Sequence, residues 1–300
     1  MSAPFFIAEV SSNHARDLSR CKAFVQAAAD MGCDAVKLQL FRIEELFSKE
    51  ILDRSEEHRA RKNWELPVEF LPELARHCKS VGIQFSCTPF YLSAVDELSP
   101  YVDFFKIASY ELPWDALIAS CAATKKPLVL STGMATLDEV LHAVDVFEKA
   151  GGEDLTLLHC VSGYPAPAES CNLSAINTIR AATGRSVGWS DHSRSPNIVD
   201  RAIARFGASM IEFHLDLDEQ GAEYKTGHCW LPHEMAPVIR QHQKLDSAVE
   251  QRRDMAMADG DGIKTPTPAE IDDRPWRADP SDGLRPTLKV REEWLARPLQ

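Results

Sequence analysis

The stretch SVGWSDH (residues 186–192) is followed by one amphipathic helical pattern (197–207) and then by MIEFHLDL (residues 210–217). A strand, a helix and a second strand form the unit that places two parallel strands side by side. Because the carboxyl ends of such strands lie together, His192 and His214 are predicted to be neighbours. Two neighbouring imidazoles can share one divalent metal ion.

The same alternation recurs along most of the chain. Short runs rich in β-branched and aromatic residues predict strands at 5–10, 35–41, 84–90, 103–109, 127–132, 155–162, 186–192 and 210–217. Helical patterns follow them at 18–31, 67–81, 92–98, 114–124, 137–150, 173–182, 197–207 and 233–250. Eight strand–helix pairs favour an α/β fold of the closed (β/α)8 TIM-barrel type over an open sheet. The first strand is also not followed by the GxGxxG of open dinucleotide-binding sheets.

The end of the chain has a different character. Residues 259–300 are rich in Pro, Asp and Arg and show little periodicity. We therefore expect one barrel domain over residues 1–252 and an extended C-terminal tail over residues 253–300, which wraps the barrel or is partly disordered.

Composition excludes several classes of function. The formal net charge is −12 and no Lys/Arg-rich tract occurs, which argues against nucleic-acid binding. No apolar run reaches membrane-spanning length, and the first ten residues do not resemble a secretory signal. The eight cysteines fit neither a zinc ribbon nor a CxxC motif. We expect a cytoplasmic protein with reduced thiols and no membrane partner.

Side-chain alternation indicates which polar residues enter the barrel. In the strand at 35–41, Lys37 and Gln39 share one face, and the apolar residues on the other face should meet the helices. Lys106 repeats this pattern two strands later. Two lysines in one barrel mouth suit a phosphate or carboxylate ligand. The alternative for Lys37 is an ion pair with a barrel carboxylate such as Glu9.

Other polar residues stand at predicted strand ends. Hydroxyl groups at these strand ends are candidates to complete the anion site, and the residues are Thr88, Ser109, Ser162 and Ser190. The alternative is a turn role, which is the more common one for Ser and Thr at strand ends. Glu9 and Glu111 are candidate acid–base or hydroxyl-binding groups, with ion pairs to Lys37 or Lys106 as the alternative. His192 and His214 are candidate metal ligands, with substrate oxygens completing the coordination shell, and a structural role is the alternative for each. His228, in the loop GHCWLP, is a candidate substrate contact.

Eight segments occur in a fixed order along the chain. They are AEVSSNH (8–14), AVKLQLF (35–41), FSCTPF (85–90), FFKIASYEL (104–112), PLVLSTGMATLDEV (127–140), LLHCVSGYPAP (157–167), VGWSDHS (187–193) and IEFHLDLD (211–218). With these segments the chain resembles the sialic acid synthase (N-acetylneuraminate synthase-like) family, which condenses phosphoenolpyruvate with an N-acetylated sugar. The similarity extends from about residue 5 to about residue 241.

The resemblance implies a (β/α)8 barrel, a divalent metal (Mn²⁺ or Mg²⁺) and cleavage of the C–O bond of phosphoenolpyruvate. It implies that His192 and His214 bind the metal and that Glu9 lies near the reacting centre. Phosphoenolpyruvate would be surrounded by Lys37, Thr88, Lys106, Ser109, Ser162 and Ser190. Ser162 stands where better-known members have Asn. The sugar, an aldose such as N-acetylmannosamine or a relative, would face Gln39, Glu111 and Tyr164.

The chain departs from the family pattern on the acceptor side. Many members carry a C-terminal antifreeze-like domain that supplies an arginine to a partner subunit, and we expect this chain to lack it. Arg274, Arg277 and Arg285 are the candidate substitutes, and the alternative is that no arginine is needed. In the loop after the last strand, GAEYKTGHCWLP replaces Pro-Gly-Pro-Asp, and Glu223 is expected to replace the Asp as a sugar contact. Ala15-Arg16 replaces the usual Asn-Gly.

These observations favour a metal-dependent synthase that joins phosphoenolpyruvate to an aldose with release of phosphate. A Schiff-base pyruvate aldolase that uses Lys106 or Lys37 is one alternative. A non-catalytic barrel that binds a sugar phosphate or a partner protein is the other. A homodimer is compatible with the long apolar-faced helices.

Overall fold

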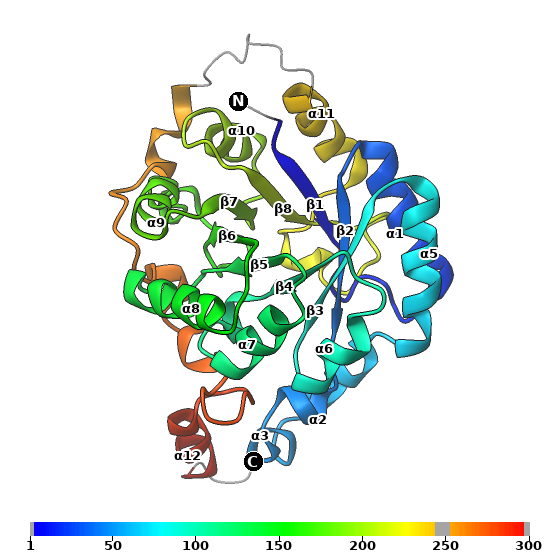
Figure 1. The fold of residues 1–300 in the computed structure, drawn as a ribbon, viewed down its shortest axis with the longest axis vertical. Coiled ribbons are helices and arrows are strands. Elements are labelled where there is room, and N and C mark those ends of the chain that lie inside the picture. The colour runs from blue at the N-terminus through cyan, green and yellow to red at the C-terminus, as the bar shows by residue number, and fades with distance from the viewer. Residues whose placement is uncertain (1–2, 244–252, 297–300) are drawn as a thin grey trace.

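The computed structural model describes residues 3–243 and 253–296, and it is a closed barrel of eight parallel strands (Figure 1). Each strand pairs with the next in the sequence, and β8 pairs with β1 to close the ring. The strands are β1 (Phe5–Glu9), β2 (Ala35–Leu40), β3 (Gln84–Pro89), β4 (Phe104–Ile107), β5 (Leu128–Ser131), β6 (Leu155–Cys160), β7 (Ser186–Asp191) and β8 (Met210–His214). The predicted TIM barrel is therefore confirmed.

One helix or a group of helices follows each strand and covers the outside of the barrel (Figure 1). The principal helices are α1 (Leu18–Met31), α5 (Leu71–Val81), α6 (Leu92–Leu98), α7 (Asp115–Ala123), α8 (Leu137–Lys149), α9 (Ala175–Thr183), α10 (Pro196–Ala204) and α11 (Pro232–Gln243). The TLDE segment forms the capping box of α8, in which Thr136 and Glu139 bond each other's backbone N–H groups. Residues 244–250 of the last predicted helix lie outside the described residues.

The alternation in β2 places apolar and polar side chains as predicted. Val36 and Leu38 join the large apolar cluster between the strands and the helices. Inside the barrel, a small apolar cluster closes the end at which the strands begin; its buried members are Ile7, Ala35, Phe104, Val129 and Leu158. The next inward positions of β1, β2 and β4 are Glu9, Lys37 and Lys106. Ionisable groups therefore lie directly above the apolar floor of the barrel.

The connection between β2 and α5 contains short helices that sequence periodicity did not reveal. They are α2 (Ile43–Leu46), α3 (Lys49–Leu52), α4 (Glu56–Ala60), and the 3-10 turns η1 (Arg61–Trp64) and η2 (Val68–Phe70). Each has five residues or fewer, which is too short for a hydrophobic repeat to show. They build one wall above the barrel mouth.

The described part of the tail packs on the barrel. It contains the 3-10 turns η6 (Arg253–Ala258), η7 (Pro268–Glu270) and η8 (Arg274–Trp276) and the helix α12 (Leu288–Ala296), which was not predicted. Backbone hydrogen bonds attach the tail to the start of α9 (Leu173 N–H to Ala258 C=O) and to the start of α8 (Leu137 N–H to Lys264 C=O). Farther along, Arg285 exchanges backbone hydrogen bonds with the α2–α3 segment, and α12 lies against α3. The described part of the tail therefore lies against the barrel.

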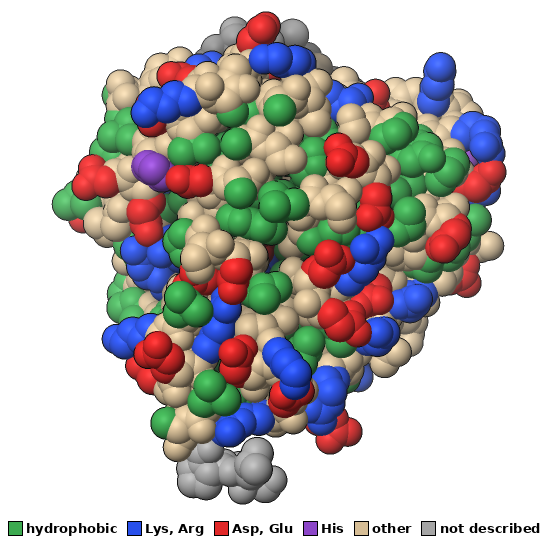
Figure 2. Space-filling view, turned by 60° about the horizontal axis from the view of Figure 1, so that its bottom comes forward, with side chains coloured by type: hydrophobic (Ala, Val, Ile, Leu, Met, Phe, Trp, Pro, Cys, Tyr) green, Lys and Arg blue, Asp and Glu red, His purple; other side chains and the backbone are tan. Residues whose placement is uncertain are grey.

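None of the described helices has the length and apolar character needed to cross a bilayer. On the face shown in Figure 2, acidic and basic side chains are interspersed, and no large area carries a single sign of charge. This agrees with the absence of a basic tract in the sequence.

Candidate active site

A cavity of about 610 Å³ opens at the carboxyl ends of the strands. Its size suits a small-molecule site, and its position is the one that TIM barrels use for catalysis. The walls include most of the residues that the sequence singled out; those are Lys37, Gln39, Lys106, Ser109, Tyr164, Ser190, His192, His214, Glu223 and His228. Four others lie behind the wall or beside it, and they are Glu9, Thr88, Glu111 and Ser162.

The floor of the cavity is a buried network of two lysines and two glutamates. Lys37 pairs with Glu9, and its Nζ lies 3.8 Å from Glu212 Oε2. Lys106 Nζ lies 3.3 Å from Glu212 Oε1, which also accepts a hydrogen bond of 2.9 Å from Ser190. The two lysines do converge in one mouth, and the ion pair considered for Lys37 and Glu9 is present.

The two lysines differ in electrostatic state. Burial alone would lower the pKa of Lys37, but Glu212 and Glu9 outweigh it and raise that pKa above its usual value. For Lys106 burial dominates, so its pKa is lowered although Glu212 partly opposes the shift. Burial raises the pKa of Glu212, but the two ammonium groups more than reverse this and lower it. The network therefore holds the Glu212 carboxylate charged, and Lys106 is less fully compensated for its burial than Lys37.

The predicted hydroxyl groups occupy one side of this floor. Thr88 Oγ1 accepts a hydrogen bond of 3.2 Å from Lys37 Nζ. Ser109 Oγ accepts one of 2.9 Å from the backbone N–H of Gly133. Ser162 Oγ is buried without a partner, and a Cβ placed on Gly133 would lie 2.4 Å from it. The absence of a side chain at position 133 therefore leaves room for the hydroxyls of Ser109 and Ser162, and the Ser162 hydroxyl has no hydrogen-bond partner within the described residues.

Three imidazoles and one phenol form the opposite side of the cavity. The ring centres of His192 and His214 are 5.4 Å apart, as expected for the ends of adjacent strands. His228 approaches from the loop after β8, with its ring centre 4.5 Å from that of His214. The Tyr164 ring lies 4.3 Å from the His192 ring and 4.9 Å from the His228 ring.

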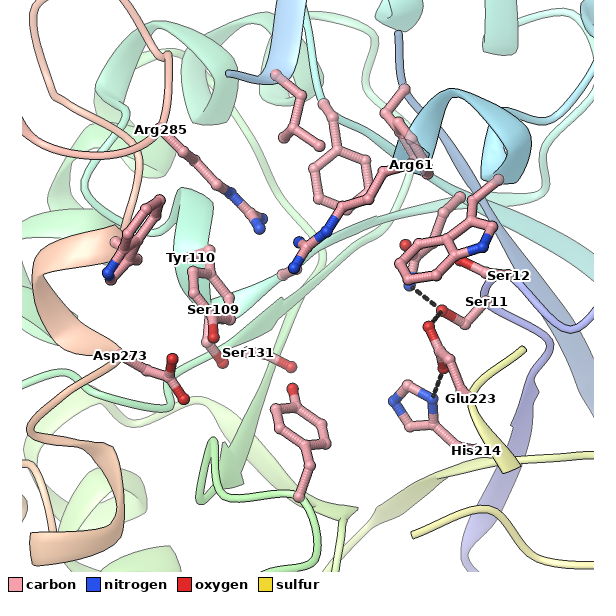
Figure 3. Close-up of a pocket in the computed structure, with 18 of the residues that line it drawn as sticks. Ser11, Ser12, Arg61, Ser109, Tyr110, Ser131, His214, Glu223, Asp273 and Arg285 are labelled. Carbon is pink, nitrogen blue, oxygen red and sulfur yellow. Dashed lines mark hydrogen bonds and ion pairs between the residues drawn. The ribbon is translucent and has the colours of Figure 1, made fainter. Parts of the chain in front are cut away.

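A chain of hydrogen bonds connects the imidazoles with the floor. Gln39 Nε2 donates to Glu9 Oε1 at 2.8 Å and to Ser11 Oγ at 3.0 Å. Ser11 donates to Glu223 Oε1 at 2.5 Å, and Glu223 Oε2 lies 3.1 Å from His214 Nδ1 (Figure 3). Burial would raise the pKa of Glu223, but hydrogen bonds from the histidines lower it, so it stays a carboxylate. Glu223 therefore orients the His214 ring.

The donor atoms suit a divalent metal ion. His214, Glu223, His228 and Cys229 each offer one ligand atom, and these atoms lie within 4.8 Å of one another. His192 Nδ1 is 2.7 Å from the Val161 carbonyl oxygen, an interaction that orients the other ring nitrogen for coordination. Imidazole nitrogens are common ligands of divalent transition metals. The residues present therefore fit such an ion.

The far end of the cavity is built by the tail and by the β2–α5 connection. Glu111 is fully buried and pairs with Arg285 of the tail, not with Lys106 as considered from the sequence. The guanidinium of Arg285 also lies 4.2 Å from the centre of the Tyr110 ring. Arg61 points into the same space from the opposite wall (Figure 3).

The other two candidate arginines of the tail have a structural role. Arg274 and Arg277 both bond Glu139 at the start of α8, and neither lines the cavity. Of the three candidates, only Arg285 reaches the cavity.

Sequence reasoning missed several residues of the site, including Ser11, Tyr110, Glu212, Gly133, Arg61 and Asp273. Glu212 shares a strand face with His214, a signal that was visible in the alternation of β8. Gly133, in the segment STGM, becomes meaningful only when Ser109 and Ser162 are seen beside it. Arg61 and Asp273 come from irregular segments and carried no local signal.

Comparison with known proteins agrees with this geometry. The chain matches the NeuB family over residues 24–254. It is 34% identical to the N,N'-diacetyllegionaminic acid synthase of Campylobacter jejuni over 286 residues, which cover 90% of this chain and 81% of that protein.

Two crystal structures resemble this chain over most of their length. The spore coat polysaccharide biosynthesis protein SpsE of Bacillus subtilis matches with a TM-score of 0.80 and 30% identity over 91% of this chain and 77% of that one. The N-acetylneuraminic acid synthetase of Leptospira borgpetersenii, in complex with citrate, matches with a TM-score of 0.72 and 30% identity, covering 81% of this chain and 84% of that one. With its closed barrel and the ionisable groups gathered at one mouth, the chain belongs to the NeuB family.

Proposed function

We propose that this protein condenses phosphoenolpyruvate with an aldose, such as N-acetylmannosamine or a related acylated sugar, and releases phosphate. The observation that carries the proposal is the meeting of two buried lysines and two histidines in one cavity. The cavity offers cationic and hydroxyl groups on one side and imidazoles on the other, which suits an anionic donor beside an aldehyde. The legionaminic acid synthase among the relatives supports a nonulosonic acid as the product.

Phosphoenolpyruvate would lie on the lysine side. Lys37 and Lys106 would offset the charge of its carboxylate and phosphate, with hydrogen bonds from hydroxyl groups in reach; the hydroxyl residues are Thr88, Ser109, Ser162 and Ser190. Ser109 and Ser190 line the cavity, and Ser162, which is buried beside it, has an Oγ without a hydrogen-bond partner within the described residues. This fixed array would orient the donor before reaction.

The aldose would lie between the imidazoles and the tail. Gln39, Glu111 and Tyr164 would face it, and the predicted contacts Glu223 and His228 line the same cavity. Arg285 holds Glu111 at this end, so the tail shapes the acceptor side.

In the reaction, C3 of phosphoenolpyruvate would attack the aldehyde carbon, water would add at C2, and phosphate would leave with the bridging oxygen. A divalent ion held by His192 and His214 would supply Lewis-acid polarisation of the aldehyde. Glu9 is the candidate base for the water, since Lys37 and Gln39 hold its carboxylate beside the floor of the cavity. The lysines would stabilise the charge of the departing phosphate.

The test is phosphate release from phosphoenolpyruvate with Mn²⁺ or Mg²⁺ and a panel of acylated aldoses. We expect release to depend on both metal and aldose, and to be abolished by His192→Ala and by His214→Ala. His142→Ala is the matched control, because His142 lies on the exposed surface of α8, where it pairs with Asp115. Near-normal turnover of either cavity variant would contradict the assignment of the metal ligands.

One observation favours the second candidate, a Schiff-base pyruvate aldolase. Burial lowers the pKa of Lys106, which is a property of imine-forming lysines. Borohydride reduction in the presence of pyruvate distinguishes the two functions, because only an imine becomes a stable adduct. We expect no adduct at Lys106 or at Lys37.

The proposal includes a cytosolic location, which the eight free, buried cysteines support. A homodimer stays a prediction, and sedimentation of the purified protein would test it.

A further inference from the structure

We infer that His228 is a third protein ligand of the metal ion, together with His192 and His214. The sequence indicated His228 only as a sugar contact. The inference rests on the proposed function for the presence of a metal ion, but it is carried by the geometry of the three rings. It assigns to Glu223 and Thr226 the role of holding two of those rings in place.

The spacing of the rings is the first observation. A metal–imidazole bond is about 2 Å long and the ring centre lies about 1 Å farther, so two ligands of one ion have ring centres about 5 Å apart. The ring centres of His214 and His228 are 4.5 Å apart, and those of His192 and His214 are 5.4 Å apart. The third separation, between His192 and His228, is 6.2 Å. His214 and His228 therefore offer donor atoms within reach of one ion as they stand, whereas His192 lies outside that group and must turn towards the ion to bind it.

The second observation is that each imidazole has its Nδ1 occupied by an oxygen. His192 Nδ1 lies 2.7 Å from the Val161 carbonyl oxygen. His214 Nδ1 lies 3.1 Å from Glu223 Oε2. His228 Nδ1 lies 2.6 Å from Thr226 Oγ1.

The same nitrogen is therefore left for coordination on every ring, namely Nε2. An oxygen partner at the opposite nitrogen is the usual way in which proteins orient metal-binding histidines. Within the described residues, the Nε2 atoms of His192 and His214 have no hydrogen-bond partner among protein atoms. In the same part of the chain, His228 Nε2 lies 3.9 Å from Cys229 Sγ and 3.7 Å from Glu223 Oε2, both of which are long contacts.

The remaining donor of this group is less suitable. Cys229 Sγ accepts a contact of 3.5 Å from the amide of Asn13, and Cys229 does not line the cavity. His228 does line it, beside His192 and His214. The cavity side of the group is therefore made of His214, His228 and the carboxylate of Glu223, and His192 lines the cavity beside them.

A set of three imidazoles has a consequence for metal choice. Imidazole nitrogens suit transition ions such as Zn²⁺ and Fe²⁺, whereas Mg²⁺ prefers oxygen ligands and retains its water. We therefore expect tight binding of Mn²⁺, Co²⁺ or Zn²⁺ and weak binding of Mg²⁺. Three protein ligands with open positions are also the usual arrangement of catalytic metal sites.

The experiment measures metal binding directly, without substrates. Free Mn²⁺ is followed by electron paramagnetic resonance during titration of the metal-free protein, and Zn²⁺ by competition with a chelator. We expect His228→Ala and His228→Gln to weaken binding of both ions by at least about tenfold. Cys229→Ala is the matched control, since it changes the adjacent residue, and it should stay within about twofold of wild type.

A second measurement does not depend on variants. Nitrogen couplings in the pulsed resonance spectrum of the Mn²⁺-loaded wild-type protein should correspond to three imidazoles. Two imidazoles in that spectrum, or unchanged affinity in both His228 variants, would overturn the inference. If His228 proved not to be a ligand but the wild type released phosphate, the synthase proposal would still stand. Weakened metal binding in the variants without any phosphate release would support the third ligand and contradict the synthase.

Discussion

At the scale of single residues, the donor side of the cavity depends on the absence of a side chain at position 133. A Cβ on Gly133 would lie 2.4 Å from Ser162 Oγ and 2.8 Å from Ser109 Oγ, so Gly133→Ala must displace both hydroxyls. We expect the KM for phosphoenolpyruvate to rise about tenfold, the effect of losing one hydrogen bond to a charged group. Steady-state kinetics checks this. If Gly133→Ala acts through Ser162, the KM for phosphoenolpyruvate should be similar in Ser162→Ala and in the double variant Gly133→Ala/Ser162→Ala. Additive increases in KM would contradict this explanation.

A buried histidine on the outer face of β6 makes stability depend on pH. Burial lowers the pKa of His159 to about 3, so it stays neutral in the folded protein while the unfolded chain binds a proton below about pH 6.5. Stability is therefore fully present above pH 6.5 and falls as the pH decreases towards 3.

His159 should contribute about 2 kcal/mol of the stability lost between pH 7 and pH 5. Urea unfolding of His159→Gln at the two pH values should show a correspondingly smaller loss than the wild type. His142→Gln, on the exposed surface of α8, serves as the control and should follow the wild type. Parallel pH dependence of His159→Gln and wild type would disprove the assignment.

At the scale of elements, a carboxylate of the tail holds two loops of the barrel. Glu270 in η7 is fully buried, and its Oε1 accepts hydrogen bonds of 2.7 Å from Met134 N–H and 2.8 Å from Ser162 N–H. Glu270→Ala leaves two buried N–H groups without partners, and we expect a loss of about 3 kcal/mol. Glu270→Gln retains an acceptor and should lose clearly less. Denaturant unfolding measures both, and equal stability of the two variants would contradict this role.

An ion pair between Arg285 and Glu111 joins the tail to the 3-10 turn that follows β4. Arg285→Met leaves Glu111 (in η3, Ser109–Glu111) as a buried charge, and we expect about 3–5 kcal/mol of destabilisation. Glu111→Gln in the same chain should restore part of it, since burial already raises the pKa of Glu111. A double-mutant cycle measures this coupling. Purely additive losses would show that the two residues act independently.

At the scale of the whole molecule, the sequence predicted the barrel because its elements are local and periodic. The strand β2 shows why: the inward position of Lys37 follows from alternation alone. The same rule located His192 and His214 at one mouth. What it could not predict were partners from distant or irregular segments, such as Arg285 with Glu111 and His228 with His214, because these contacts depend on how loops and the tail fold over the barrel.

The helix α12 is a second feature that the periodicity of the sequence did not predict. Its nine residues carry no clear apolar face, and its Trp294 ring lies 5.6 Å from Trp276 in η8. A hydrophobic repeat therefore could not predict this helix, which packs its Trp294 ring against Trp276.

The most direct test of the account uses phosphoenolpyruvate labelled with ¹⁸O at the oxygen that bridges C2 and phosphorus. With Mn²⁺ and an accepted aldose, we predict that all of this label appears in the released phosphate, in equal amount to a new ulosonic acid. Without an aldose, no phosphate should form. Label retained in a carbon product, or no consumption of phosphoenolpyruvate with any combination of metal and acylated aldose, would contradict the claim that this barrel mouth is a condensing site.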